Sequence, residues 1–306
     1  MEFAASAGSK LIIANDPDAD RLAVAEQDAA GHWMVFSGNE LGVLLGHWAI
    51  TRHQQLVANN NGGEAKNPAA VLASIVSSRM LKRVATAEGL QYHDTLTGFK
   101  WLGNRAVDLR ATGVSVLFSY EEALGYCVGD IICDKDGLSA AAHFVEMTHY
   151  LHSQGLSVQQ HYRQLEAKYG VFVSYNSYVI CHDSKKTDAI FARLRTGGPT
   201  GGYWTSCCDR AITSITDVTL GFDSTTSDRK STLPVTADSH MVMFEFDNGV
   251  TVTLRTSGTE PKIKFYTEIA GQPGQQREEL EPLLRTFVDA LVNEMLQPDV
   301  HGLIRA

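Results

Sequence analysis

The sequence has no run of apolar residues close to the roughly 20 that a membrane-spanning helix requires. Cysteine is scarce: there are five, an odd number, with no C-x-x-C pair, and a chain of 306 residues does not need a disulfide framework to fold. The start of the chain lacks the basic flank and apolar stretch of a secretory signal. We therefore expect a cytoplasmic protein with reduced thiols and no membrane partner.

Basic residues are also few. Lys and Arg total 26 against 35 Asp and Glu, which gives a formal net charge of −9. The resulting field repels phosphate backbones, so nucleic acid is not an expected partner, and an anionic small molecule could bind only at a local basic site. A content of 44% hydrophobic and 20% charged residues excludes a disordered chain, and 306 residues suggest about two domains.

The segment 1–34 holds two apolar runs, 10–14 and 22–25, around an acidic loop. A strand this close to the start has few local partners, and in an α/β domain it would pair with strands encoded earlier in a chain. We therefore expect 1–34 to be the remnant of a larger domain, with an exposed strand edge that permits self-association.

The stretch 35–168 predicts an α/β domain with a mixed, largely parallel sheet, because strand and helix patterns alternate along it. Ser37 and Glu40 have the spacing of a capping box ahead of a helix. The polar segment 53–67 is predicted to be an exposed loop. Expected strands cover 71–76, 90–95 and 114–118, and expected helices cover 78–89, 99–109 and 138–151.

The stretch 169–306 predicts an α+β domain with an antiparallel sheet. The sequence DNG at 247–249, between two apolar runs, is a strong hairpin signal. The glycine-rich segment 197–202 lacks the Lys-Ser/Thr of a Walker loop and is expected to be a plain loop. Expected strands cover 171–181, 212–220, 241–246, 250–254 and 263–269, and expected helices cover 185–195 and 278–296.

The first candidate site is formed by Asp16, Asp18 and Asp20 in the sequence DPDADR. Three carboxylates at alternate positions could converge on one hard cation if the loop curls around it. An EF-hand begins similarly but needs Gly and Glu where this chain has Arg21 and Gln27, so that interpretation fails. An acidic turn after a strand is the alternative. The strand-loop-strand setting and the adjacent arginine favour a divalent metal beside an anion.

The second candidate is the loop with Thr97, Gly98 and Lys100, between a predicted strand and a predicted helix. A Thr-Gly loop at a helix N-terminus offers backbone N–H groups to an anion, and the lysine adds a positive charge. Taken alone, this loop fits a plain N-cap with a solvated lysine better.

The third candidate is the pair Glu121 and Glu122, just after the apolar strand 114–118. Ligands of open α/β sheets bind beyond the carboxyl ends of strands, where two carboxylates could accept hydrogen bonds from sugar hydroxyls. A solvated acidic pair is an equally simple explanation. Lys135 follows shortly before the next predicted helix.

The fourth candidate is the sequence RTSGTEPKIK at 255–264, between two predicted strands. An arginine gives bidentate contacts, hydroxyls donate, and glycine lets the backbone approach closely, so this composition fits a phosphate cradle better than a plain polar hairpin tip. Three or four charge-assisted bonds of about 1.5–3 kcal/mol each could hold a phosphate dianion in an acidic protein. The candidate contacts are Arg255, Ser257, Gly258, Thr259 and Lys264.

Two other pairs carry less weight. His149 and His152 lie one helical turn apart without a third ligand nearby, so a surface pair is expected rather than a metal site. Cys207 and Cys208 cannot easily pair with each other and are expected to be buried or loop thiols.

In this order and at these spacings, the four segments resemble the α-D-phosphohexomutase superfamily of phosphoglucomutases and phosphomannomutases. NDPDADRLAVAE resembles the family's metal loop, TLTGFKWLGNR and SYEEALGY…DKDGLSAA its sugar-recognition segments, and RTSGTEPKIKFY its phosphate-binding loop. The similarity covers essentially the whole chain and is greatest to the phosphoglucomutase-type branch that includes phosphopentomutases and glucose-1,6-bisphosphate synthases. It implies that 1–34 ends a second domain, 35–168 is a third domain and 169–306 is a fourth.

The resemblance implies an intramolecular phosphotransferase that interconverts sugar 1-phosphates and 6- or 5-phosphates through a phosphoserine and a bisphosphate intermediate. It implies a phosphosugar ligand, a sugar bisphosphate activator, and Mg²⁺ held by Asp16, Asp18 and Asp20. Arg21, Lys100 and Lys135 would be the cationic catalytic contacts. Substrate contacts would come from Thr97, Gly98, Glu121, Glu122, Arg255, Ser257, Gly258, Thr259 and Lys264.

The sequence departs from the family pattern in two ways. Ala123 stands where many relatives have serine, so glucose, mannose and pentose phosphates are not distinguished. The chain also contains no Thr-Ala-Ser-His-Asn-Pro type loop for the phosphoserine, so we expect it to lack mutase activity by itself. A non-catalytic sugar-phosphate-binding or regulatory protein remains the main alternative. A sugar phosphatase is disfavoured, because aspartates that all bind metal leave none as a nucleophile.

Overall fold

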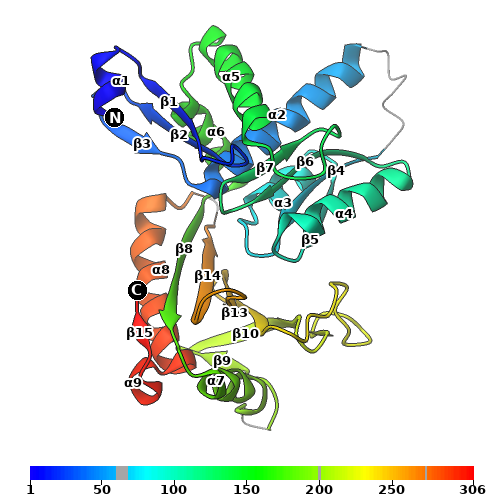
Figure 1. The fold of residues 1–306 in the computed structure, drawn as a ribbon, viewed down its shortest axis with the longest axis vertical. Coiled ribbons are helices and arrows are strands. Elements are labelled where there is room, and N and C mark those ends of the chain that lie inside the picture. Colours follow the sequence, from blue (N-terminus) through cyan, green and yellow to red (C-terminus); the bar gives the residue numbers. More distant parts are fainter. Residues whose placement is uncertain (60–67, 199–200, 273) are drawn as a thin grey trace. The chain divides into compact units, whose positions relative to one another are not determined.

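The computed structural model describes residues 1–59, 68–198, 201–272 and 274–306. The chain forms two compact units, Met1–Tyr169 and Gly170–Ala306 (Figure 1). The segment 1–34 lies within the first unit, and its assignment to a separate domain stays a prediction. No helix in the described ranges combines the length and the apolar character needed to cross a bilayer.

The first unit begins with a small antiparallel sheet in the order β1-β2-β3. Strand β1 pairs with β2, which follows it in the chain, as Ile12 opposite Ala25 illustrates. In β2, Leu22, Val24 and Ala25 are buried, whereas β1 is at most half-buried and lies at the edge of the sheet. The elements are helix α1 (Glu2–Ser6) and strands β1 (Leu11–Asn15), β2 (Leu22–Gln27) and β3 (Trp33–Val35).

The amides of β1 are expected to exchange with solvent at least roughly tenfold faster than those of a central strand, because edge strands open locally at low cost. Ile12 and Ile13 can be compared with Val116 and Leu117 by hydrogen-exchange NMR or mass spectrometry at a concentration where the chain is monomeric. Equal protection of the two pairs would contradict the expectation. Slower exchange at β1 only at high protein concentration would indicate the self-association predicted above.

The second sheet of this unit has the order β5-β4-β6-β7. β4 runs parallel to both β5 and β6, whereas β7 runs antiparallel to β6, so the sheet is mixed as expected. A register shift in the β4–β6 pairing lies between Ala70 and Val71, so Val116 and Phe118 lie opposite these two neighbouring residues. The strands are β4 (Ala69–Ser74), β5 (Gln91–Thr95), β6 (Ser115–Glu121) and β7 (Gly125–Val128).

Five longer helices lie in the described part of the first unit. The capping box is confirmed: the backbone N–H of Ser37 donates to Glu40 at 2.8 Å, and that of Glu40 donates to the Ser37 hydroxyl at 3.2 Å. The predicted loop at 53–67 is wrong for its first part, because the helix continues to Asn59; the remainder, 60–67, lies outside the described residues. The helices are α2 (Gly38–Asn59), α3 (Met80–Ala87), α4 (Phe99–Ala111), α5 (Gly137–Ser153) and α6 (Val158–Tyr169).

Helix α2 packs very closely on the sheet because glycine recurs at every fourth position. A Cβ on Gly42 would lie 2.3 Å from the ring of Tyr120, and one on Gly46 would lie 2.6 Å from the Leu81 side chain. At the helix start, a Cβ on Gly38 would lie 1.8 Å from the carbonyl oxygen of the turn after β6. The glycines therefore set the distance between the helix and the loop that follows β6.

Helix α6 was not predicted, and a buried carboxylate caps it. Glu26 at the end of β2 accepts hydrogen bonds from the backbone N–H groups of Val158 at 2.9 Å and Gln159 at 2.8 Å. The negative charge also interacts favourably with the positive end of the helix dipole. This contact attaches one end of the small N-terminal sheet to the rest of the first unit.

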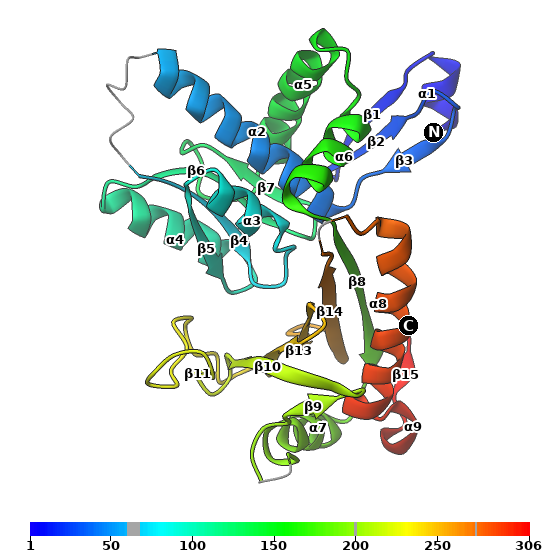
Figure 2. The same cartoon turned by 180° about the vertical axis from the view of Figure 1, so that it is seen from behind.

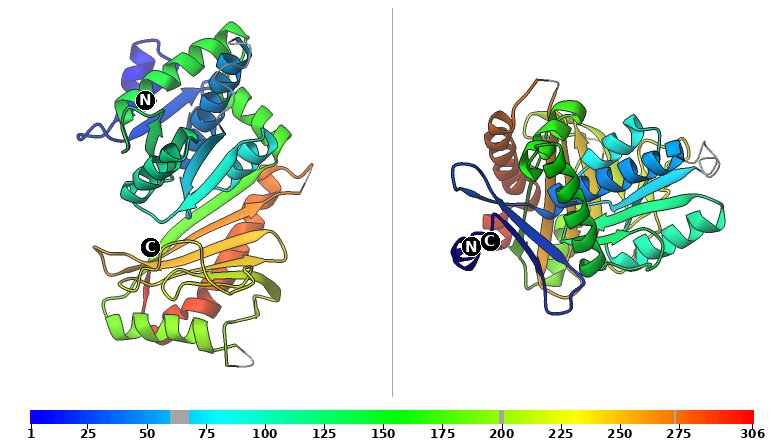
Figure 3. Two further views of the ribbon diagram at one scale, coloured as in Figure 1. Left: turned by 90° about the vertical axis from the view of Figure 1, so that its right-hand side faces the viewer. Right: turned by 90° about the horizontal axis from the view of Figure 1, so that it is seen from above.

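The second unit contains one eight-stranded sheet, antiparallel at every described pairing, which confirms the predicted α+β class. The left view of Figure 3 shows its strands running side by side. The 247–249 turn joins two strands as expected, with Gly249 at a φ of 79°. The strands are β8 (Phe172–Ile180), β9 (Ser206–Cys207), β10 (Arg210–Asp217), β11 (Phe222–Asp223), β12 (Met241–Phe246), β13 (Val250–Thr256), β14 (Lys262–Ala270) and β15 (Ile304–Arg305).

Helices cover the apolar face of this sheet, and Figure 2 shows α8 running along β8. Alternate residues of the strands, such as Val252, Leu254 and Phe265, form one core cluster with Phe191 and Leu284 of the helices. The predicted helix 278–296 is interrupted near its end by a π-helical turn. The elements are α7 (Ser184–Thr196), α8 (Arg277–Leu291), η1 (Val292–Leu296) and α9 (Pro298–His301).

A buried ion pair lies in the second unit. Arg195 on α7 contacts Asp217 at the end of β10 at 2.6 Å, and the aspartate is fully buried. The hydroxyl of Tyr203 donates to the same carboxylate at 2.9 Å, and the backbone N–H of Leu220 donates to it at 3.2 Å. The carboxylate is therefore satisfied on both oxygens, as a buried charge must be.

Candidate functional site

The acidic loop lies between β1 and β2 and is organised by its own arginine. Arg21 donates from its backbone N–H to Asp16 at 3.1 Å and from Nε at 2.8 Å. Ala19 adopts a φ of 58°, which turns the loop back on itself. Desolvation alone would raise the pKa of Asp16, but the hydrogen bonds and charge of Arg21 hold that pKa below its usual value.

Asp20 makes a contact with a distant predicted site residue. Its carboxylate lies 2.9 Å from the Nζ of Lys135, and this hydrogen bond is the main reason why the pKa of Lys135 is raised. The charge of Glu121 contributes in the same direction. Two of the four predicted segments, the first and the third, thus come together around Lys135.

The three aspartates do not form a coordination shell in this arrangement. Within the described part of the chain, the only three His, Cys, Asp or Glu residues with ligand atoms all within 4.8 Å of one another lie elsewhere. Asp16 and Asp20 instead pair with Arg21 and Lys135. Carboxylate oxygens fit Mg²⁺ chemically. Coordination would require the metal to compete with these two cations for the same oxygens.

The acidic loop is docked on the two neighbouring loops by backbone contacts. The N–H of Leu22 donates to the carbonyl of Leu124 at 3.1 Å, and the N–H of Gly137 donates to Ala19 at 3.0 Å. A Cβ on Gly137 would lie 2.3 Å from the carbonyl oxygen of Arg21, so only glycine permits this approach. The position of the loop is therefore fixed by the segments that follow β6 and precede α5.

The second candidate loop contacts the third. The backbone N–H of Gly98, which has a φ of 106°, donates to the carboxylate of Glu121 at 2.5 Å. The amide expected to receive an anion is therefore occupied by a carboxylate here. Thr97 is half-buried beside it, and Lys100 is exposed with its Nζ 5.4 Å from the ring centre of Trp101.

Glu122 lies against the end of the neighbouring strand β4. Its carboxylate accepts a hydrogen bond from Ser74 at 3.2 Å, and its backbone N–H donates to Ser77 at 3.1 Å. The two serine hydroxyls are 2.8 Å apart. These contacts fix the turn after β6. The candidate role of Glu122 as a sugar ligand stays a prediction.

In the second unit, the fourth candidate segment joins β13 to β14. Arg255 and Lys264 are directly opposite each other in the strand register, so they share one face of the sheet. Lys262 pairs with Glu260 at 2.6 Å and lies 4.1 Å from the ring centre of Tyr178. The remaining tip residues Gly258 and Thr259 are exposed, and Ser257 is half-buried.

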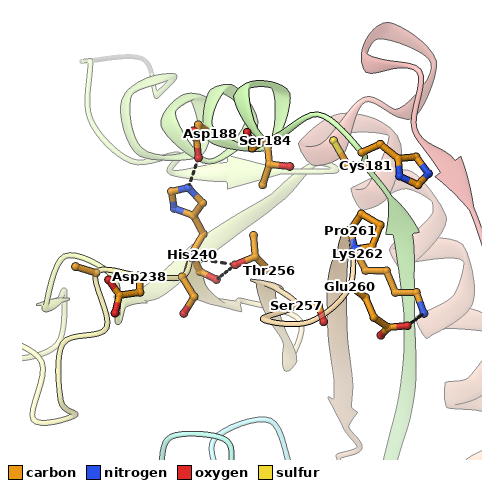
Figure 4. A pocket seen from close by; sticks show the side chains of 14 residues that line it. Cys181, Ser184, Asp188, Asp238, His240, Thr256, Ser257, Glu260, Pro261 and Lys262 are labelled. Atoms are coloured by element: carbon orange, nitrogen blue, oxygen red, sulfur yellow. Dashed lines mark hydrogen bonds and ion pairs between the residues drawn. The ribbon is translucent and has the colours of Figure 1, made fainter.

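A pocket of about 440 Å³ lies beside this segment, as Figure 4 shows. Its lining includes Thr256, Ser257 and Lys262, from the end of β13 to the start of β14. It also includes His240, just before β12, and Asp188 on α7. The His240 ring nitrogen is 2.9 Å from the Asp188 carboxylate. The sequence analysis missed these two residues, because they are separated by 52 positions and carry no motif.

Comparison with known proteins identifies an α/β domain of a described family in the first unit. The family description "Phosphoglucomutase/phosphomannomutase, alpha/beta/alpha domain III" matches residues 37–169. The structure resembles the phosphoglucomutase parafusin of Paramecium, with a TM-score of 0.62, 19% identity and coverage of 96% of this chain and 46% of that one. It also resembles a putative phosphomannomutase from Thermus thermophilus, with a TM-score of 0.56, 16% identity and coverage of 92% and 46%. At these identities the likeness supports the fold alone.

The sequence is much more similar to several curated proteins. Human phosphopentomutase is 42% identical over 296 residues, which cover 96% of this chain and 48% of that protein. Human glucose 1,6-bisphosphate synthase is 42% identical over 305 residues, with coverage of 99% and 49%. A probable phosphoribomutase of Schizosaccharomyces pombe is 39% identical over 306 residues, with coverage of 99% and 50%. The chain spans about half the length of the curated relatives it matches.

Proposed function

The chain belongs to the phosphoglucomutase/phosphomannomutase superfamily, and on this premise we propose that it contributes the metal loop, the sugar-recognition loops and a phosphate-binding loop to a sugar-phosphate mutase. The observation that carries the proposal is the contact between Asp20 and Lys135 at 2.9 Å, which joins an acidic loop to a cationic loop at one place in the first unit. Such a place can receive a phosphate and a divalent cation together.

Asp16, Asp18 and Asp20 would hold Mg²⁺, which supplies positive charge next to a phosphoryl group during transfer. The chain's own residues have separate tasks in this proposal. Arg21 and Lys135 exchange their carboxylate partners for phosphate oxygens. Both cations are already close to the acidic loop, so little movement is needed for this exchange.

In the second unit, Arg255 and Lys264 would bind the phosphate that is not transferred. Their register places two positive charges on neighbouring strands and on the same face of the sheet. The exposed tip with Gly258 and Thr259 leaves backbone N–H and hydroxyl groups within reach of the same ligand.

We expect this chain to bind glucose 6-phosphate weakly and without Mg²⁺, because all groups of the phosphate loop come from one continuous segment. Arg255→Ala should weaken binding by about 10- to 100-fold, since a bidentate charge-assisted contact of about 1.5–3 kcal/mol is lost. Calorimetry or NMR titration measures this effect, and ribose 5-phosphate in parallel tests the pentose preference suggested by the relatives' names.

Arg285→Ala is the matched control. The substitution removes the same charge from an exposed arginine on α8, whose guanidinium lies 4.8 Å from the ring centre of Tyr175. Equal binding by the Arg255→Ala variant and the unmutated chain, or binding that requires Mg²⁺, would contradict the assignment of this loop. Turnover of glucose 1-phosphate by the highly purified chain, with bisphosphate added, would contradict the proposal that the phosphoserine must come from outside these 306 residues.

A further inference from the structure

The adjacent residues Cys207 and Cys208 form the tip of a tight hairpin in the second unit. Arg210 lies opposite Cys207 in the β9–β10 register, so the connecting turn consists of two residues only. Both residues of the turn have positive φ, 53° at Cys208 and 57° at Asp209, which is the type I′ geometry. Such turns favour asparagine or glycine, and a cysteine at this position costs about 1 kcal/mol or more.

This turn brings the two thiols together. The Sγ atoms are 3.4 Å apart and are not bonded to each other. Two sulfur ligands of a tetrahedral zinc ion, each with a bond of about 2.3 Å, lie about 3.8 Å apart. The observed separation is therefore close to the spacing that one thiophilic metal ion requires, and far above the disulfide bond length of about 2.05 Å.

A third ligand comes from the π-helical segment η1. The carboxylate of Glu294 accepts a hydrogen bond from the backbone N–H of Cys208 at 2.9 Å. One of its oxygens and both sulfur atoms all lie within 4.8 Å of one another, the only such group of three in the described part of the chain. Arg193 donates to the carbonyl oxygen of Glu294 at 3.2 Å and so holds this segment in place.

The group is accessible on one side. Cys207 is buried and Cys208 is half-buried, whereas Glu294 is exposed. Solvent can therefore supply a fourth ligand to an ion that is held by two sulfur atoms and one oxygen.

We propose that Cys207, Cys208 and Glu294 form a binding site for a thiophilic divalent metal ion of the zinc class. The site lies in the second unit and does not depend on the sugar-phosphate function proposed above. The donors differ from the oxygen-only set of the acidic loop, and soft sulfur ligands select zinc or cadmium over magnesium.

The thiols are protonated before the metal arrives. Burial is the main cause that raises the pKa of both, to about 11 for Cys208, and the charge of Glu294 adds to this effect. Two protons must therefore leave for each bound ion. Zinc binds the thiolate form, so calorimetry in buffers of different ionisation enthalpy should count about two released protons for each bound ion.

The decisive test is titration of the full chain with Zn²⁺ and with Cd²⁺, whose thiolate charge-transfer absorption reports sulfur ligation. We expect one ion per chain with this absorption. Cys208→Ser should lower the affinity by more than about 100-fold, and Glu294→Gln, which keeps the hydrogen-bond acceptor, by about 10-fold. Cys133→Ser, at an exposed cysteine elsewhere, is the matched control and should change nothing.

Circular dichroism verifies that each variant is folded. If a cysteine variant does not fold, Glu294→Gln still tests the site. Binding without charge-transfer absorption, or with the same affinity in Cys208→Ser and Glu294→Gln, would place the metal elsewhere and overturn the proposal. Absence of thiol-dependent binding at an excess of either metal would overturn it as well.

Discussion

Replacing Asp217 with alanine is expected to lower the free energy of unfolding of the second unit by about 3–5 kcal/mol, because it leaves Arg195 as a largely buried charge without its carboxylate. The hydrogen bonds from Tyr203 and Leu220 are lost at the same time. Urea unfolding followed by circular dichroism measures the effect, and hydrogen exchange of the β10 and β12 amides localises it.

Two comparisons identify the cause. Glu260→Ala removes a carboxylate from a solvent-screened ion pair in the same unit and should cost far less stability than Asp217→Ala. The double variant Arg195→Met with Asp217→Leu removes both charges and should be more stable than Asp217→Ala alone. If the double variant is less stable than the single one, the uncompensated charge is not the reason for the loss.

Replacing Gly38 with alanine is expected to lower the free energy of unfolding of the first unit by about 3 kcal/mol. The added Cβ would lie 1.8 Å from the carbonyl oxygen of Glu122, and backbone atoms cannot yield as a flexible side chain can. The turn after β6 would have to move by more than an ångström. The carbonyl of Leu124 accepts a hydrogen bond from the N–H of Leu22, so the acidic loop should shift as well. The NMR resonances of residues 16–21 would report this shift.

Whether Gly38→Ala lowers or raises the free energy of unfolding distinguishes a packing clash from helix propensity. In an exposed helix, alanine is more favourable than glycine by up to about 1 kcal/mol. Gly202→Ala is the control, because its Cβ would meet nothing within 4 Å, and it should change stability by less than about 0.5 kcal/mol. A neutral or stabilising Gly38→Ala would show that the helix can move away from the turn at no cost.

Much of the fold could be predicted because its periodic patterns are local. β12 was predicted with the bounds it has, since a nearly continuous apolar run ends at a DNG turn. Helix α6 was missed, because Tyr162 and Tyr169 form much of its buried side and most of the other positions are polar. The end of α2 was assigned to a loop, because 53–67 is mostly polar, although Leu56 and Val57 are apolar and the helix continues to Asn59.

The candidate site could be predicted only as separate loops. The sequence placed Asp20 and Lys135 on different segments, and their contact depends on the acidic loop lying beside β7, where Arg21 forms an isolated bridge with Gly125. The pairing of Gly98 with Glu121 could not be read from spacing, because it depends on the parallel order of β5, β4 and β6. The proximity of Glu294 to Cys208 links residues 86 positions apart and has no local signal.

The cap on α6 has a consequence for how the chain is made. Glu26 and Val158 are 132 positions apart, so at about 5–20 residues per second a ribosome needs roughly 7–26 s to travel between them. The segments after β6 and before α5, on which the acidic loop rests, are also synthesised in this interval. Until then the acidic loop lacks the contacts that hold it in the folded chain. The speed of translation across this stretch therefore sets how long the nascent hairpin is available to chaperones, to free metal ions or to other chains.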